Sequence, residues 1–139
     1  MKLLTKYKTT YHNIEFNLIF HSRMTIIDGE SGIGKSMIFK AMKQDSIENN
    51  LGYLCLNYKD KENNNIEHAI KLAKNRIIII DDADVVLTLE QKLYIARDKD
   101  NQYIIFAHST EGFFPTDSSI AELIGCDNKR ELVYDLLED

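Results

Sequence analysis

Apolar side chains at every second position predict an antiparallel β-hairpin at the start of the chain. Ile14, Phe16, Leu18 and Phe20 alternate with mostly polar residues, which predicts a strand with one buried face. A weaker Thr- and Tyr-rich strand precedes them, and His12-Asn13 is the expected turn. We therefore expect a hairpin over residues 3–20. Its tyrosines Tyr7 and Tyr11 are candidates to stack on a nucleotide base.

Buried strands alternate with helical segments in the next part of the sequence. The short apolar runs at 24–28, 52–58 and 102–107 predict strands, and the four isoleucines at 77–80 predict a strand buried on both faces. Helical spacing of apolar residues predicts helices over about 35–47, from Ile66 to Ala73, and after the capping box Thr88-x-x-Gln91. Residues 59–65 are wholly polar, so we expect a solvent-exposed loop there.

The last thirty residues leave two structures open. Segments 120–124 and 131–137 fit either a hairpin around Asp127-Asn128-Lys129 or a strand followed by a helix. We favour at least one added strand, and therefore a β-rich tail over about 110–139.

Composition is that of one globular domain. The chain has 139 residues, of which 44% are hydrophobic and 28% are charged. Its net charge of −5 indicates no general attraction to nucleic acid. No apolar run approaches the length of a membrane helix, and the N-terminus has no apolar signal segment. Cys55 and Cys126 lack metal-ligand spacing, so we expect reduced thiols, no membrane insertion and a cytoplasmic location.

The strongest chemical signal is the stretch GESGIGKS, Gly29 to Ser36, between a predicted strand and a predicted helix. It fits the phosphate-binding P-loop pattern G-x-x-x-x-G-K-[ST] in the structural context that the pattern requires. Its glycines allow the backbone to turn tightly around an anion. The predicted nucleotide-binding residues are Gly29, Glu30, Ser31, Gly32, Ile33, Gly34, Lys35, Ser36 and Met37.

Carboxylates follow the isoleucine strand, at the end where open α/β sheets bind ligands. Asp81 is predicted to hold Mg²⁺ together with the Ser36 hydroxyl, while Lys35 binds the β- and γ-phosphates. Asp82 is the candidate base that positions the attacking water. We interpret Asp84 mainly as a turn-forming residue before the next helix. His108, at the end of the strand 102–107, is the candidate γ-phosphate sensor; with Lys35 and Asp82 it completes the predicted catalytic set.

These motifs resemble Walker A and Walker B of P-loop NTPases, and more narrowly those of ABC- and AAA-type ATPases. The resemblance covers about residues 14–109. It implies that the strand ending in His108-Ser109 lies between the two Walker strands, and that His108 corresponds to a switch histidine. Residues 59–75 leave no room for a helical subdomain, and no LSGGQ-like stretch is present. We therefore expect a minimal domain without signature or lid.

The expected fold class is a three-layer P-loop NTPase with a mainly parallel sheet and an N-terminal antiparallel hairpin. We expect a single domain that comprises the hairpin (3–20), a nucleotide-binding core (24–109) and the tail (110–139).

The leading functional hypothesis is a slow Mg²⁺-dependent ATPase. Arginine is scarce, so we expect the missing positive charge to come from Arg23, Arg97 or Arg130 of a neighbouring copy, or from a larger assembly. A stretch that would read guanine is missing, which favours ATP. One alternative is an ATP-binding switch without turnover. Another is a small-molecule or nucleoside kinase, although residues 85–101 offer only one arginine for a lid.

Overall fold

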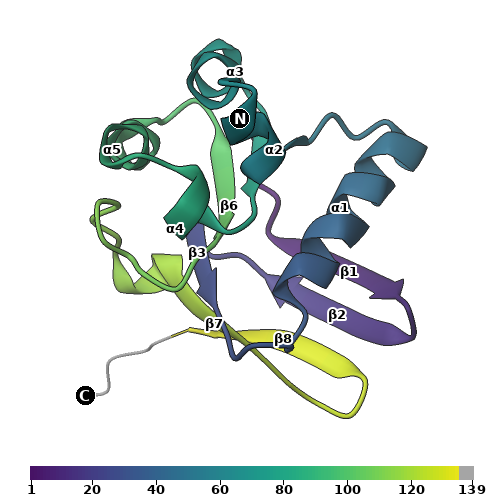
Figure 1. The fold of residues 1–139 in the computed structure, drawn as a ribbon. Coiled ribbons are helices and arrows are strands. Elements are labelled where there is room, and N and C mark those ends of the chain that lie inside the picture. The colour runs from purple at the N-terminus through teal and green to yellow at the C-terminus, as the bar shows by residue number, and fades with distance from the viewer. Residues whose placement is uncertain (135–139) are drawn as a thin grey trace.

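Eight strands form one continuous sheet in the computed structural model, which describes residues 1–134 (Figure 1). The strands are β1 Lys6–Tyr11, β2 Ile14–Ile19, β3 Met24–Asp28, β4 Leu54–Leu56, β5 Ile77–Ile80, β6 Gln102–Phe106, β7 Ile120–Cys126 and β8 Lys129–Tyr134. The helices are α1 Lys35–Asn49, α2 Tyr58–Glu62, α3 Ile66–Leu72, α4 Ala83–Val86 and α5 Leu89–Arg97, with a 3₁₀ turn at Asp117–Ser119. Across the sheet the strands lie in the order β1-β2-β8-β7-β3-β6-β5-β4.

The predicted N-terminal hairpin is confirmed. β1 and β2 pair antiparallel, and the turn residues His12 and Asn13 have φ values of 49° and 66°. Two consecutive positive φ values are those of the tight turn that matches the twist of paired strands. Phe16 and Leu18 are buried while their neighbours along β2 are exposed, as the alternating pattern requires.

The tail forms a second hairpin, which decides between the two structures left open by its sequence. β7 and β8 pair antiparallel around Asp127 and lie between β2 and β3. Within this arrangement β8 is parallel to β2, and β7 is parallel to β3. The predicted β-rich tail is therefore confirmed up to residue 134. Residues 135–139, which include the end of the segment 131–137, lie outside the described residues.

The predicted fold class is wrong. The sheet is mixed and curls into a half-barrel, with four of its eight strands in the two antiparallel hairpins (Figure 1). The β1–β2 hairpin lies at one edge of the sheet, but the β7–β8 hairpin separates it from the central parallel strands. Local sequence patterns define the buried face of each strand but not its partner. The insertion of β7 and β8 into the middle of the sheet was therefore missed.

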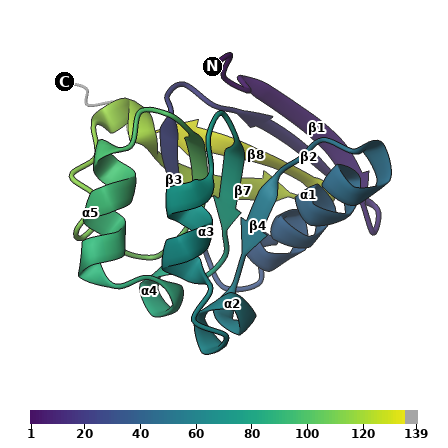
Figure 2. The same cartoon turned by 90° about the horizontal axis from the view of Figure 1, so that it is seen from above.

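The curvature of the sheet creates two hydrophobic cores. In the first, α1 packs inside the curl, and its residues Ile38, Phe39 and Met42 belong to one buried cluster with residues of both hairpins and the central strands. In the second, α3 and α5 cover the other face of β3, β5 and β6 (Figure 2). The isoleucines Ile78 to Ile80 of β5 are fully buried because the two cores cover opposite faces of that strand.

Two local predictions also need correction. β4 has three residues rather than the seven expected over 52–58, and α2 occupies most of the predicted loop. α2 begins with a capping box in which Asn57 and Asp60 bond each other's backbone N–H groups. That Asn-x-x-Asp spacing is visible in the sequence. Among residues 1–134, no helix is long and apolar enough to cross a membrane.

Candidate functional site

The carboxyl ends of β3, β5 and β6 meet at one edge of the sheet. β6 lies between β3 and β5 and pairs parallel with both, the neighbour order that the resemblance implied. The side chains at the carboxyl ends of these three strands are therefore brought together. Asp28 and His108, for example, are 80 positions apart in the sequence but in contact.

The loop from Gly29 to Ser36, hereafter the glycine loop, connects β3 to α1. Gly32 and Gly34 have φ values of 83° and 122°, a region that other residues rarely adopt. A Cβ atom at Gly29 would lie 2.9 Å from the Ile33 side chain and 3.0 Å from the Leu123 carbonyl oxygen. All three glycines are thus required by the path of the backbone.

The amino end of α1 has no side chain that caps its free backbone N–H groups. Gly34 is the N-cap and has no side chain to accept a hydrogen bond, and the first turn contains no acidic residue. The first backbone N–H groups of a helix lack intrahelical partners and carry partial positive charge. Together with Lys35, this end of α1 is suited to an anion.

Asp28 connects three parts of the site. Its Oδ1 atom accepts a hydrogen bond from the Gly29 N–H at 2.7 Å and lies 2.8 Å from Nδ1 of His108. The same oxygen lies 3.8 Å from Nζ of Lys35, which also donates a hydrogen bond to the Gly29 carbonyl. Asp28 therefore holds the lysine and the histidine beside the glycine loop.

Ser36 and Asp81 are the predicted metal ligands, and they are adjacent. The Ser36 hydroxyl donates to Oδ2 of Asp81 at 3.3 Å. Burial raises the pKa of the Asp81 carboxyl, while this hydrogen bond acts in the opposite direction. Among residues 1–134 no group of three or more His, Cys, Asp or Glu residues is arranged to hold a metal. The hydroxyl and carboxylate fit Mg²⁺, which commonly takes few protein oxygens and completes its shell with water and phosphate oxygens.

Asp82 follows Asp81 with an unusual backbone. Its φ and ψ of 53° and 52° are left-handed, a conformation that Asp tolerates better than most residues. It is the N-cap of α4 but makes no capping bond with its side chain, which is exposed. Its carboxylate is thus not committed to the helix end. The water-positioning role of Asp82 stays a prediction.

Asp84 is a positioning residue that the sequence did not reveal. Its two carboxylate oxygens accept the N–H groups of His108 at 2.7 Å and Ser109 at 3.1 Å. The carboxylate thereby fixes the loop that follows β6. Asp28 was missed in the same way, and its one sequence signal is its place at the end of a strand next to the glycine loop.

The residues predicted to act in catalysis or to hold the metal all line one pocket of about 320 Å³. Its lining residues are Lys35, Ser36, Asn57, Tyr58, Asp81, Asp82, Phe106, Ala107 and His108. Asn57 and Tyr58 were not predicted, but they follow β4, which ends at the same edge of the sheet.

The other predicted nucleotide-binding residues lie along the glycine loop with different side-chain environments. Glu30 and Ser31 are exposed, whereas the side chains of Ile33 and Met37 pack against the first core. Tyr7 does not suit base stacking, because it is buried and its hydroxyl donates to Asp45 at 2.9 Å. Tyr11 is partly buried and meets the His12 ring edge-on.

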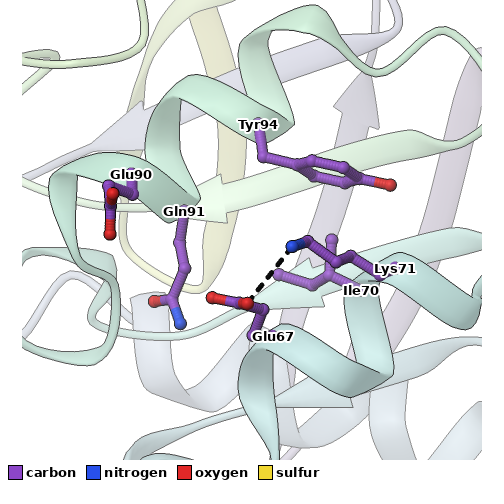
Figure 3. A pocket seen from close by; sticks show the side chains of 6 residues that line it. All are labelled: Glu67, Ile70, Lys71, Glu90, Gln91 and Tyr94. Atoms are coloured by element: carbon purple, nitrogen blue, oxygen red, sulfur yellow. Dashed lines mark hydrogen bonds and ion pairs between the residues drawn. The ribbon is translucent and has the colours of Figure 1, made fainter.

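A second pocket, of about 200 Å³, lies between α3 and α5 (Figure 3). Its charged groups are largely engaged with one another. Lys71 forms an ion pair with Glu67 at 3.2 Å and lies 5.9 Å from the centre of the Tyr94 ring. None of the predicted site residues lines it, and we assign it no chemistry.

No protein-family model matches the chain, and no curated protein matches it significantly.

Proposed function

We propose that this protein binds ATP with Mg²⁺ at the glycine loop and hydrolyses it slowly. One observation carries the proposal: Lys35, the Ser36–Asp81 pair and His108 converge on a single pocket at the open end of α1. A phosphate chain needs a cation, free N–H groups and a metal ligand within a few ångströms of one another, and this pocket offers all three.

Each residue has a defined part in the proposed reaction. Lys35 and the N–H groups of the glycine loop bind the β- and γ-phosphates, and Lys35 exchanges its bond to the Gly29 carbonyl for them. Ser36 and Asp81 are the side chains that would hold Mg²⁺, which supplies charge stabilisation on the phosphate oxygens. Asp82, free of the helix end, orients water toward the γ-phosphate.

His108 and Asp28 connect phosphate binding to the rest of the site. Nδ1 of His108 lies 2.8 Å from Oδ1 of Asp28, and the His108 backbone N–H donates to Asp84. The imidazole is therefore held at the edge of the pocket, within reach of a bound terminal phosphate. We propose ATP rather than GTP because no guanine-reading stretch is present.

Binding is tested by titrating the purified protein with ATP and Mg²⁺ in a calorimeter. Lys35→Ala removes a charge-assisted contact to phosphate and is expected to weaken binding about 10- to 100-fold. Lys43→Ala is the matched control, because it removes the same charge from an exposed position on the same helix. Equal binding by the wild type and Lys35→Ala would refute the proposed site.

Turnover is tested separately by phosphate release. Asp82→Asn is expected to keep ATP affinity and to lose at least 10-fold in kcat, because the amide cannot act as a base. Asp100→Asn, an exposed carboxylate next to the opposite end of β6, is expected to behave as wild type. If the wild type binds ATP but releases no measurable phosphate, the proposal of an ATPase is wrong and an ATP-binding switch takes its place.

A further inference from the structure

Arg130 of β8 bonds the outer side of the glycine loop. Its Nε atom donates to the Ile33 carbonyl at 2.7 Å, and its Nη1 atom donates to the Asp127 and Lys129 carbonyls, each at 2.9 Å. The last two bonds hold the guanidinium against the turn of its own hairpin. The first joins that hairpin to the glycine loop, 97 positions earlier in the chain.

A glycine on β7 makes room for this arginine. Gly125 pairs with Arg130 across the hairpin, and a Cβ atom there would lie 2.5 Å from Cδ of Arg130 and 2.8 Å from its Nη1 atom. The lack of a side chain at Gly125 therefore leaves space for the Arg130 side chain, whose Nε atom reaches the Ile33 carbonyl. Phe16 supports the loop as well, since a Cβ atom at Gly34 would be 3.4 Å from the Phe16 ring.

The bond to Ile33 determines how the next peptide group points. In a trans peptide, the carbonyl and the following N–H point in opposite directions. Because the Ile33 carbonyl is held outward by Arg130, the Gly34 N–H is turned to the opposite side of the loop. Within residues 1–134 that N–H makes no hydrogen bond, and Gly34 directly precedes the open end of α1.

We propose that Arg130 is a positioning residue that orients the Gly34 N–H toward bound phosphate and couples the β7–β8 hairpin to nucleotide binding. This inference rests on the proposed function of the glycine loop. The guanidinium acts through the peptide and does not touch the phosphates. By thermodynamic reciprocity, phosphate on the inner side of the loop strengthens the Arg130–Ile33 bond and stabilises the hairpin.

The first test compares Arg130→Met with Lys129→Met by ATP titration and steady-state kinetics in the presence of Mg²⁺. Both variants remove one positive charge from adjacent positions of β8, but only Arg130 bonds the loop through its side chain. We expect Arg130→Met to weaken ATP affinity and raise KM about 10-fold, with kcat within 2-fold of wild type. Lys129→Met is expected to stay within 2-fold in both, and Arg130→Lys to recover only part of the affinity because it lacks the Nε donor.

The second test is hydrogen exchange of the wild-type protein with and without ATP and Mg²⁺. Backbone amides of residues 127–134 are expected to exchange more slowly when nucleotide is bound, and this protection is expected to be lost in Arg130→Met. A wild-type hairpin that gains no protection on nucleotide binding overturns the coupling even if Arg130→Met fails to fold.

The outcomes separate the two proposals. If the wild type binds ATP, either of two results overturns the role of Arg130 but leaves the proposed function intact. One is an unchanged ATP affinity in folded Arg130→Met, and the other is a wild-type hairpin that gains no protection with nucleotide. Absence of ATP binding by the wild type overturns the proposed function and this inference with it. A parallel fall in kcat and thermal stability, without a change in KM, would indicate a purely structural arginine and also overturn the inference.

Discussion

Asp98 shows how a single partly buried carboxylate stabilises the sheet end opposite the candidate site. Its Oδ2 atom accepts hydrogen bonds from the Tyr103 hydroxyl at 2.6 Å and the Asn101 amide at 2.7 Å, and its Oδ1 atom accepts the Asp100 N–H at 2.8 Å. Burial alone would raise the pKa of Asp98, but these three donors outweigh it and lower the pKa. The ionised carboxylate is therefore the form that the fold favours.

This shift predicts a defined pH dependence of stability. A carboxyl whose pKa is lower in the folded state stabilises the protein above its unfolded pKa, about 3.9, and loses that contribution as pH falls through the folded value. Asp98→Asn is expected to cost about 1–2 kcal/mol at pH 7, because its amide cannot accept all three bonds. The difference from wild type should shrink below about pH 4 in urea unfolding.

Asp100→Asn is the control for this prediction at the residue scale. Its carboxylate makes an exposed ion pair with Lys74 at 2.9 Å, and such pairs contribute little. We therefore expect no measurable change in the free energy of unfolding for Asp100→Asn. A similar loss in both variants, or a pH-independent loss in Asp98→Asn, would contradict the assigned network.

At the scale of elements, the start of α5 makes a prediction that tests local sequence signals. The Thr88 hydroxyl accepts the Gln91 N–H at 3.1 Å, and the Gln91 side chain accepts the Thr88 N–H at 2.9 Å. Thr88→Ala is expected to lower the free energy of unfolding by about 1 kcal/mol, whereas Thr88→Ser should change it by a few tenths. Chemical unfolding measures both. Equal losses would mean that the threonine methyl group, not the capping bond, stabilises the helix.

The elements also show what could be predicted from the sequence. The capping box at Thr88, the hairpin with its turn at His12-Asn13, and the strand–loop–helix around Lys35 were predicted because neighbouring residues determine them. The parallel pairing of β2 with β8 joins segments more than 100 positions apart, and no local pattern carries that information. This pairing, together with that of β7 and β3, produces the mixed half-barrel.

Some residues of the candidate site could likewise be predicted from local sequence, and others could not. Lys35, Ser36 and Asp81 were predicted from motifs, because their spacing along the chain fits patterns that are associated with phosphate and metal binding. Asp84 and Arg130 act on backbone groups brought near them only by tertiary structure. Carboxylates in turns and arginines in strands are common, so neither residue type identifies such a partner by itself.

On the scale of the whole molecule, the positions of the arginines limit how the proposed ATPase can obtain a transition-state charge. Arg130 is committed to its own glycine loop. Arg23 precedes β3 and Arg97 ends α5, just before the turn into β6. Both therefore lie near the amino ends of the central strands, while the candidate site lies at the carboxyl ends. Neither can reach the site of its own chain without unfolding part of the sheet.

A head-to-tail contact between copies would bring the exposed Arg97 of one molecule to the pocket of the next. We therefore predict that ATP turnover per molecule rises with protein concentration, and that Arg97→Ala lowers the high-concentration rate at least 10-fold while ATP affinity is unchanged. Lys99→Ala removes an exposed charge two residues further on and is expected to keep the concentration dependence.

Mixing Arg97→Ala with Lys35→Ala gives the sharpest measurement. The first variant has an intact pocket and the second an intact arginine, so activity recovered only in the mixture would require a shared site. Turnover strictly proportional to concentration down to the nanomolar range would instead assign the whole reaction to one chain.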